Sequence, residues 1–255
     1  MYEILPQVVR RRLDPRARYG LRLTLFLVAV SLVAVPFAWL VVEITSDDDV
    51  VEFDTAASER LFELKTGTPW LSKILNGISL LGHPVWFWIL IGGVAFYLWL
   101  RHRPRLVAFL VASTLGGAVL NRVVKIAVSR PRPTYRDPAA ILYQEGMSFP
   151  SGHAMGSTIA YGALLLVFLP VIPRRYRKWA LGGVAGLVTL IGASRLGLGV
   201  HYVSDVAGGF ILGLAWLIAS TAAFSLWRVD RGRSPVQPLG GVEPEAERDL
   251  NPASG

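Results

Sequence analysis

Six long apolar segments constrain this chain more than any other feature of its sequence. A helix needs about 20 mostly apolar residues to cross a hydrocarbon core of roughly 30 Å. Only 17% of the 255 residues are charged, against about 25% in ordinary soluble domains. We therefore predict an all-α polytopic membrane bundle with six transmembrane helices. The predicted spans lie near 21–43, 84–100, 105–127, 154–172, 179–198 and 203–227.

Two regions near the N-terminus need a separate interpretation. Residues 69–82 precede the short second span, and we expect them to form an interfacial helix before the chain enters the membrane. The first apolar run follows Arg10, Arg11 and Arg12, as the apolar core of a signal peptide would. However, it is about 22 residues long, and no clear cleavage site follows it. We therefore expect a retained first span.

The last part of the chain differs in composition from the spans. Residues 229–255 are rich in proline, glycine and charge, and they show no apolar periodicity. This composition predicts a single membrane domain over 1–228, followed by a disordered tail over 229–255.

The distribution of positive charge predicts the orientation. The net charge of +8 could indicate a nucleic-acid partner, but basic residues lie between apolar runs instead of alternating with aromatic residues on a polar surface. Seventeen of the 26 Lys and Arg residues flank one set of span ends, and nine lie elsewhere. Because cytoplasmic loops carry the excess of Lys and Arg, we predict a multi-pass protein with both termini in the cytoplasm and no nucleic-acid partner.

Four predicted spans carry polar groups at a similar depth. With a rise of about 1.5 Å per residue, Lys125 and Arg195 lie roughly 30 and 26 Å from the cytoplasmic ends of their helices. His153 and Asp205 lie roughly 32 and 35 Å from the cytoplasmic ends of theirs. Snorkelling to the headgroups could explain cations such as Arg122, but not histidine and aspartate at the same level. These residues therefore predict a shared polar site near the outer interface.

The end of the third span combines cations with prolines. Six residues separate Lys125 from Arg132, and Pro131 and Pro133 stiffen the segment that leaves the helix. A lysine on a helix end and an arginine on a rigid segment can grip one anion from two directions. Arg130 also precedes a proline, so it competes with Arg132 as a ligand.

The start of the fourth span has features of an anion site. Ser151 can act as the N-cap, and Gly152 lets the backbone approach a ligand closely. The free amides of the first turn would then face an anion. An ordinary helix start is the alternative interpretation. His153 follows directly and adds a titratable side chain.

His201 and Asp205 lie four residues apart at the start of the sixth span. If this segment is helical, the carboxylate can orient the imidazole and make its distal nitrogen a nucleophile or base. Two histidines and an aspartate could instead hold a metal, but the nearby cations would repel it. We expect no metal and no cofactor, and an anionic substrate, most plausibly a phosphate.

Taken together, these motifs resemble the three-part signature of the type 2 phosphatidic acid phosphatase superfamily. This family of membrane lipid phosphatases shares a site with vanadium haloperoxidases. The order and the spacing of the motifs both match, over residues 125–205. The motifs are Lys125-x6-Arg132-Pro133, Pro150-Ser151-Gly152-His153 and Ser194-Arg195-x5-His201-x3-Asp205.

The resemblance implies a role for each motif residue. His201 would attack phosphorus and form a phosphohistidine, Asp205 would orient it, and His153 would protonate the leaving oxygen. The motif spacing favours Arg132 over Arg130 as a ligand. The phosphoryl oxygens would be held by Lys125, Arg132, Arg195, Ser151 and the amide of Gly152.

The resulting hypothesis is a metal-independent phosphatase of a lipid phosphate or diphosphate, with its active site on the extracytoplasmic side. A polyprenyl diphosphate is the first candidate substrate, followed by phosphatidylglycerol phosphate and phosphatidate. The alternatives are a lipid phosphotransferase and a non-catalytic membrane protein that binds an anion or a lipid. A soluble haloperoxidase is disfavoured by the six predicted spans. The sequence predicts no oligomeric state.

Overall fold

Helices make up most of the residues described by the computed structural model, which are 31, 35–46, 49–65, 68–133, 146–236, 240–246 and 250. The described part of the chain contains no β-strand. Its helices are Val35–Thr45, α3 (Asp49–Lys65), α4 (Pro69–Leu80), α5 (Pro84–Leu100), α6 (Pro104–Val128), α7 (Gly152–Phe168), α8 (Arg177–Gly197) and α9 (Val203–Asp230). Three short 3-10 helices are η1 (Leu169–Val171), η2 (Arg174–Tyr176) and η3 (Pro244–Ala246).

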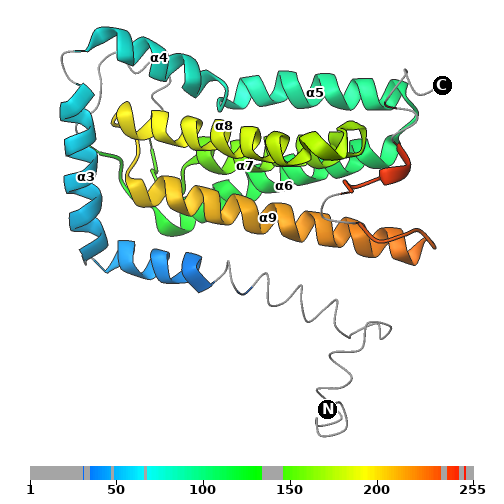
Figure 1. Cartoon of the computed structure of the whole chain (residues 1–255). Helices are drawn as coiled ribbons and strands as arrows, with labels where there is room; N and C mark the ends of the chain where they lie inside the picture. The colour runs from blue at the N-terminus through cyan, green and yellow to red at the C-terminus, as the bar shows by residue number, and fades with distance from the viewer. Residues whose placement is uncertain are drawn as a thin grey trace, which may run out of the picture.

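The long helices form a bundle around α7, while α3 crosses one end of it (Figure 1). Close approach between α7 and α9 depends on small residues in α9. A Cβ at Gly209 would lie 2.8 Å from the Ser151 carbonyl oxygen, and one at Gly213 would lie 3.0 Å from that of Met155. Glycines four residues apart let helix backbones meet in a membrane. This packing brings the start of α7 against the start of α9.

Four of the helical segments are long and apolar enough to cross a membrane: Pro104–Val128, Gly152–Val171, Arg174–Gly197 and Val203–Asp230. They correspond to the last four predicted spans. The pair α4 and α5, bent by 41° at a short break, can form a fifth. The predicted all-α membrane bundle is therefore confirmed, but the number of six spans is not.

The two N-terminal predictions have different outcomes. Most of the first predicted span, 21–43, lies outside the described residues. Its end falls in the shorter apolar helix Val35–Thr45. The expected helix before the second span is present as α4, and the break follows from Pro84 at the start of α5, with His83 accepting a hydrogen bond from the Val85 amide (3.3 Å). The interfacial position of α4 stays a prediction.

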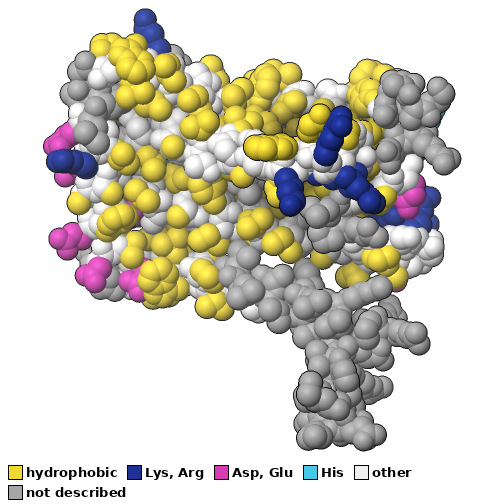
Figure 2. Space-filling view, in the orientation of Figure 1, with side chains coloured by type: hydrophobic (Ala, Val, Ile, Leu, Met, Phe, Trp, Pro, Cys, Tyr) yellow, Lys and Arg dark blue, Asp and Glu magenta, His cyan; other side chains and the backbone are white. Residues whose placement is uncertain are grey.

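Large apolar side chains cover the outside of the bundle. Trp88 is 62% exposed and Trp179 is 79% exposed. Hydrophobic side chains spread across the face shown in Figure 2, between acidic side chains along α3 and a group of Lys and Arg side chains toward the other end. Such a surface suits contact with lipid, where helices satisfy their own backbone hydrogen bonds.

The segment after α9 differs from the predicted disordered tail in its described part. Val242, Ala246 and Leu250 are buried in the main hydrophobic core, and the Val242 amide donates to the Leu166 carbonyl (3.1 Å). Arg228, fully buried at the end of α9, forms ion pairs with Glu243 (3.6 Å) and Glu245 (2.8 Å). Three apolar residues spaced by four provide the packing that composition alone did not indicate.

Candidate active site

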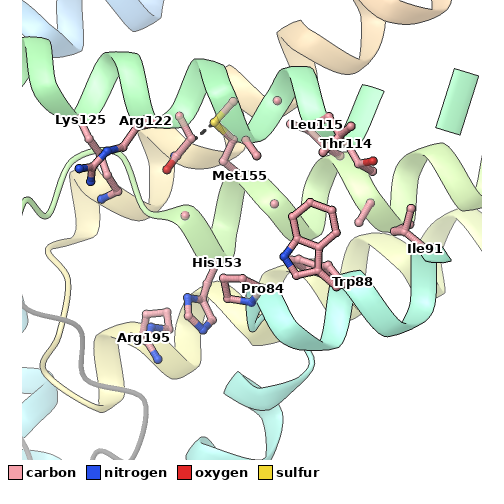
Figure 3. A pocket seen from close by; sticks show the side chains of 18 of the residues that line it. Pro84, Trp88, Ile91, Thr114, Leu115, Arg122, Lys125, His153, Met155 and Arg195 are labelled. Carbon is pink, nitrogen blue, oxygen red and sulfur yellow. Dashed lines mark hydrogen bonds between the residues drawn. The ribbon is translucent and has the colours of Figure 1, made fainter. Parts of the chain in front are cut away.

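A cavity of about 340 Å³ opens between α5, α6 and α7, and its lining runs from cationic to apolar (Figure 3). Six of the eight predicted site residues line it: Lys125, Arg132, Gly152, His153, Arg195 and His201. The other two, Ser151 and Asp205, are fully buried. Residues from three separate motifs are therefore brought together, as the depth argument predicted.

His201 lies in the turn between α8 and α9, with its ring held by a carboxylate. Its Nδ1 is 3.2 Å from Asp205 Oδ2, which also accepts a hydrogen bond from the Tyr202 amide (2.9 Å). Since an ionised carboxylate only accepts, we assign the imidazole proton to Nδ1. Nε2 is then an acceptor, 3.3 Å from Arg132 Nη1. A nucleophilic lone pair thus lies beside a guanidinium that can bind phosphate.

His153, the second residue of α7, also lines the cavity and is 5% exposed. Its Nε2 is buried without a hydrogen-bond partner among the described residues. Figure 3 shows the ring between Arg195 and Pro84. Gly82 permits this approach, because a Cβ there would lie 2.9 Å from His153 Cδ2. A buried, unpaired ring nitrogen is suited to exchange a proton with a bound ligand.

The cations of the cavity are fixed by neutral oxygens. Lys125 Nζ donates to the carbonyls of Met147 (2.8 Å) and Ser148 (3.1 Å), and Arg195 Nη1 donates to Ser79 Oγ (2.6 Å). None of these contacts neutralises the positive charge. The cavity is therefore electropositive and favours an anion.

Ser151 and Gly152 build the N-terminus of α7. The Ser151 hydroxyl caps the helix by accepting from the Ala154 amide (3.4 Å), and its own amide donates to the Asp205 carbonyl (2.9 Å). Gly152 lines the cavity, so the positive end of the α7 dipole faces the ligand space. In this structure the Ser151 side chain serves the helix cap, and Gly152 provides the surface.

Known sequences match a large part of this chain. Residues 105–228 match the PAP2 superfamily. The chain is 34% identical over 152 residues to phosphatidylglycerophosphatase B of Bacillus subtilis (strain 168), an alignment that covers 57% of this chain and 71% of that protein. The chain belongs to the PAP2 superfamily. It is accordingly a multi-pass membrane lipid phosphatase, a hydrolase.

A solved structure of a phosphatase of this type shares the fold. The PAP2-type phosphatidylglycerolphosphate phosphatase from Bacillus subtilis superposes with a TM-score of 0.69 at 25% identity, over 76% of this chain and 94% of that one. Aquifex aeolicus LpxE gives a TM-score of 0.47 at 23% identity, over 63% and 92% of the two chains.

In this PAP2 phosphatase, the surroundings of His201 favour its neutral form. Burial lowers the pKa of the imidazole well below its usual value, and the charges of Arg132, Arg195 and Lys125 lower it further. The ring is therefore unprotonated at neutral pH, as a nucleophile requires.

The structure separates the two arginines that the sequence left in competition. Arg132 lines the cavity, and its Nη1 also donates to the Val200 carbonyl (2.8 Å). Arg130 is buried behind the cavity and forms ion pairs with Asp205 (3.0 Å) and Asp54 (2.8 Å). Arg132 is thus the arginine available to a ligand.

Asp54 is a buried residue behind this site that sequence reasoning missed. It lies in α3, in the first 80 residues, where no motif was recognised. Seventy-six positions separate it from Arg130, and one sequence carries no signal of a contact at that distance. Only the crossing of α3 over the end of the bundle brings the two together.

Proposed function

We propose that this PAP2 phosphatase hydrolyses a lipid phosphate or diphosphate through a phosphohistidine on His201. One observation carries the proposal. His201 Nε2 faces a cavity lined by cations, while the Asp205 carboxylate holds Nδ1 from behind (3.2 Å). A nucleophile, an orienting carboxylate and charge stabilisation are the parts that phosphoryl transfer needs.

In the first step, Nε2 of His201 attacks phosphorus and forms an N–P bond while the P–O bond to the lipid breaks. His153, which takes up a proton when the anionic substrate binds, gives that proton to the leaving oxygen. Lys125, Arg132 and Arg195 hold the non-bridging oxygens, whose charge persists through the transition state. The Asp205 carboxylate stabilises the positive charge that develops on the attacking ring.

In the second step, water attacks phosphorus and the N–P bond breaks. Neutral His153 accepts the proton from the water, which returns both histidines to their starting forms. Inorganic phosphate then leaves. No step requires a metal ion, because the cations supply the charge that metals provide in other phosphoryl-transfer sites.

The far end of the cavity supports a substrate with a long apolar chain. Trp88, Ile91 and Leu115 line it beyond the cationic end. A polyprenyl diphosphate is the candidate from sequence, and the names of the Bacillus subtilis relatives add weight to phosphatidylglycerol phosphate. Phosphatidate remains the third candidate.

The charge distribution supports an active site on the extracytoplasmic side. The cavity lies toward the end of the bundle where α7 begins, and the cationic segment of Arg174, Arg175, Arg177 and Lys178 lies beyond the other end of α7. By the positive-inside rule, that cationic end is cytoplasmic, as are both termini.

Phosphate release from purified protein tests the proposal, with polyprenyl diphosphate, phosphatidylglycerol phosphate and phosphatidate as substrates. His201→Ala should lower kcat by several orders of magnitude, and the wild type should keep its activity in EDTA. His102→Asn is the matched control, because His102 lies in the α5–α6 turn, outside the cavity lining, with a φ of 53° that asparagine tolerates. Full activity of His201→Ala would overturn the mechanism.

Product analysis separates the remaining alternatives. Transfer of phosphate to an added alcohol in place of water would indicate a lipid phosphotransferase. Binding without turnover on all three lipids in reconstituted protein would indicate a non-catalytic lipid-binding protein.

A further inference from the structure

A second buried carboxylate lies behind the catalytic histidine. Asp54 and Asp205 are both fully buried, and Arg130, 8% exposed, lies between them. Asp54 and Arg130 are absent from the cavity lining, so they do not meet the substrate. A buried charged group needs a compensating partner, and three buried charges together are costly unless they serve a function.

The hydrogen bonds of Asp205 divide between its two oxygens. Oδ2 faces His201 Nδ1 (3.2 Å) and accepts from the Tyr202 amide (2.9 Å). Oδ1 accepts from Arg130 Nη1 (3.0 Å) and Ser148 Oγ (3.3 Å). One oxygen therefore serves the nucleophile, while the other is fixed from behind by Arg130.

Arg130 is itself held on several sides. Its Nη2 donates to Asp54 Oδ2 (2.8 Å), its Nη1 also donates to Ser204 Oγ (2.7 Å), and its guanidinium lies 4.2 Å from the centre of the Tyr202 ring. Asp54 is fixed by the Ser204 amide (2.9 Å) and by the Ser204 hydroxyl. The residues form one connected network of hydrogen bonds and ion pairs from α3 to His201.

The charges of this network determine how strongly Asp205 attracts a positively charged His201. An arginine paired with Asp205 alone would neutralise the carboxylate and weaken its attraction for a positively charged imidazole. With Asp54 present, one guanidinium is shared by two carboxylates, and the cluster keeps a net negative charge next to His201. In a buried site such a charge acts with little screening.

We propose that Asp54 is a positioning residue for the phosphatase reaction, which holds Arg130 and thereby keeps the Asp205 carboxylate fixed and negative toward His201. The proposal rests on His201 as the nucleophile, as inferred above. It predicts an effect on kcat more than on KM, because Lys125, Arg132 and Arg195, which bind the phosphoryl group, line the cavity, whereas Asp54 does not.

The pH profile provides a readout that a purely structural role would not change. His201 faces Arg132, Arg195 and Lys125 in the cavity, with His153 on α7 and Asp205 behind it. Removing the negative charge of Asp54 destabilises the imidazolium. The acidic limb of the kcat/KM profile should therefore move to lower pH in Asp54→Asn, even as the maximal rate falls.

The experiment compares wild type, Asp54→Asn, Arg130→Gln and the double variant in purified, detergent-solubilised protein. Each single variant should lower kcat by about 10- to 100-fold, as removal of the partner that orients a metal-binding histidine does, with KM within about twofold. The kcat of the double variant should be no lower than that of the less active single variant, because both changes break the same network.

Glu243→Gln is the matched control, because it also removes a buried carboxylate paired with an arginine, Arg228, at the other end of the bundle. It should lower thermal stability without changing kcat. Asp54→Asn with kcat within twofold of wild type would overturn the proposal, and so would losses that multiply in the double variant.

Two further variants cover a failure to fold and a failure of the proposed mechanism. Ser204→Ala removes the hydroxyl contacts to Asp54 and Arg130 while leaving every charge in place, and it should lower kcat about threefold to tenfold at unchanged KM. An unchanged kcat would count against the proposal. Activity in His201→Ala would instead show that the nucleophile is misassigned, whatever Asp54 does.

Discussion

Gly209→Ala tests whether the contact between α7 and α9 sets the geometry of the active site. The new Cβ would lie 2.8 Å from the Ser151 carbonyl oxygen, 2.9 Å from Ala154 Cβ and 3.1 Å from the Met155 amide nitrogen. These atoms are mostly backbone and cannot rotate away. The helices must therefore separate by about 0.6 Å to reach an ordinary contact of about 3.4 Å.

This separation acts on the two histidines of the proposed mechanism, since α7 carries His153 and the start of α9 holds His201 through Asp205. A 1 Å misplacement of reacting groups costs about 100-fold in rate, so about 0.6 Å should lower kcat by about tenfold. Overpacking should also cost about 1–3 kcal/mol of stability.

The assay is phosphate release at a temperature where the variant is fully folded, with Gly183→Ala as the control. Gly183 lies in α8, and a Cβ there meets nothing within 4 Å. This control should keep its kcat and gain about 0.5–1 kcal/mol from the better helix former. A Gly209→Ala protein with wild-type kcat would refute the idea that this helix contact positions the site.

Two other predictions follow from the cavity. Burial, together with the charge of Arg132, lowers the pKa of His201 below its usual 6.5, so its protonation is complete only well below that pH. The kcat/KM, corrected for ionisation of the substrate, should therefore not fall as the pH is lowered from 7.5 to 6.5; a loss centred above 6.5 would contradict this. Arg122 lines the cavity beside Lys125, so Arg122→Gln should raise KM about tenfold for a diphosphate lipid and less than twofold for a monophosphate lipid, as measured by steady-state kinetics. Equal changes for both would show that Arg122 does not contact a second phosphate.

The spans and the cavity-lining residues could be predicted because both leave local signals. A helix in a bilayer must be apolar over its length, so 84–100 and α5 coincide, and 105–127 differs from α6 by one residue at each end. The motif residues lie at fixed spacings near helix ends, so a common depth predicted their meeting. For Lys125 and His153, a count of residues along each helix was enough to place both side chains at one level.

The network behind the cavity left no such signal. Asp54 lies in no recognised motif, and its role depends on a contact with Ser204, 150 residues away. The choice between Arg130 and Arg132 likewise depends on which side chain turns toward Asp205, a matter of tertiary packing. The packed segment around Val242 was not predicted, because its proline and glycine content indicated disorder and three apolar residues spaced by four are a weak signal.

The burial of Arg228 affects when the end of α9 can reach its final position during synthesis. Its carboxylate partners, Glu243 and Glu245, follow it by 15 and 17 residues, so they emerge from the ribosome after α9 is complete. Until then the last helix carries a guanidinium with no counter-charge in its final site, which is costly to bury. We expect the end of α9 to stay near the membrane surface during synthesis and to settle only when the following segment folds back over it.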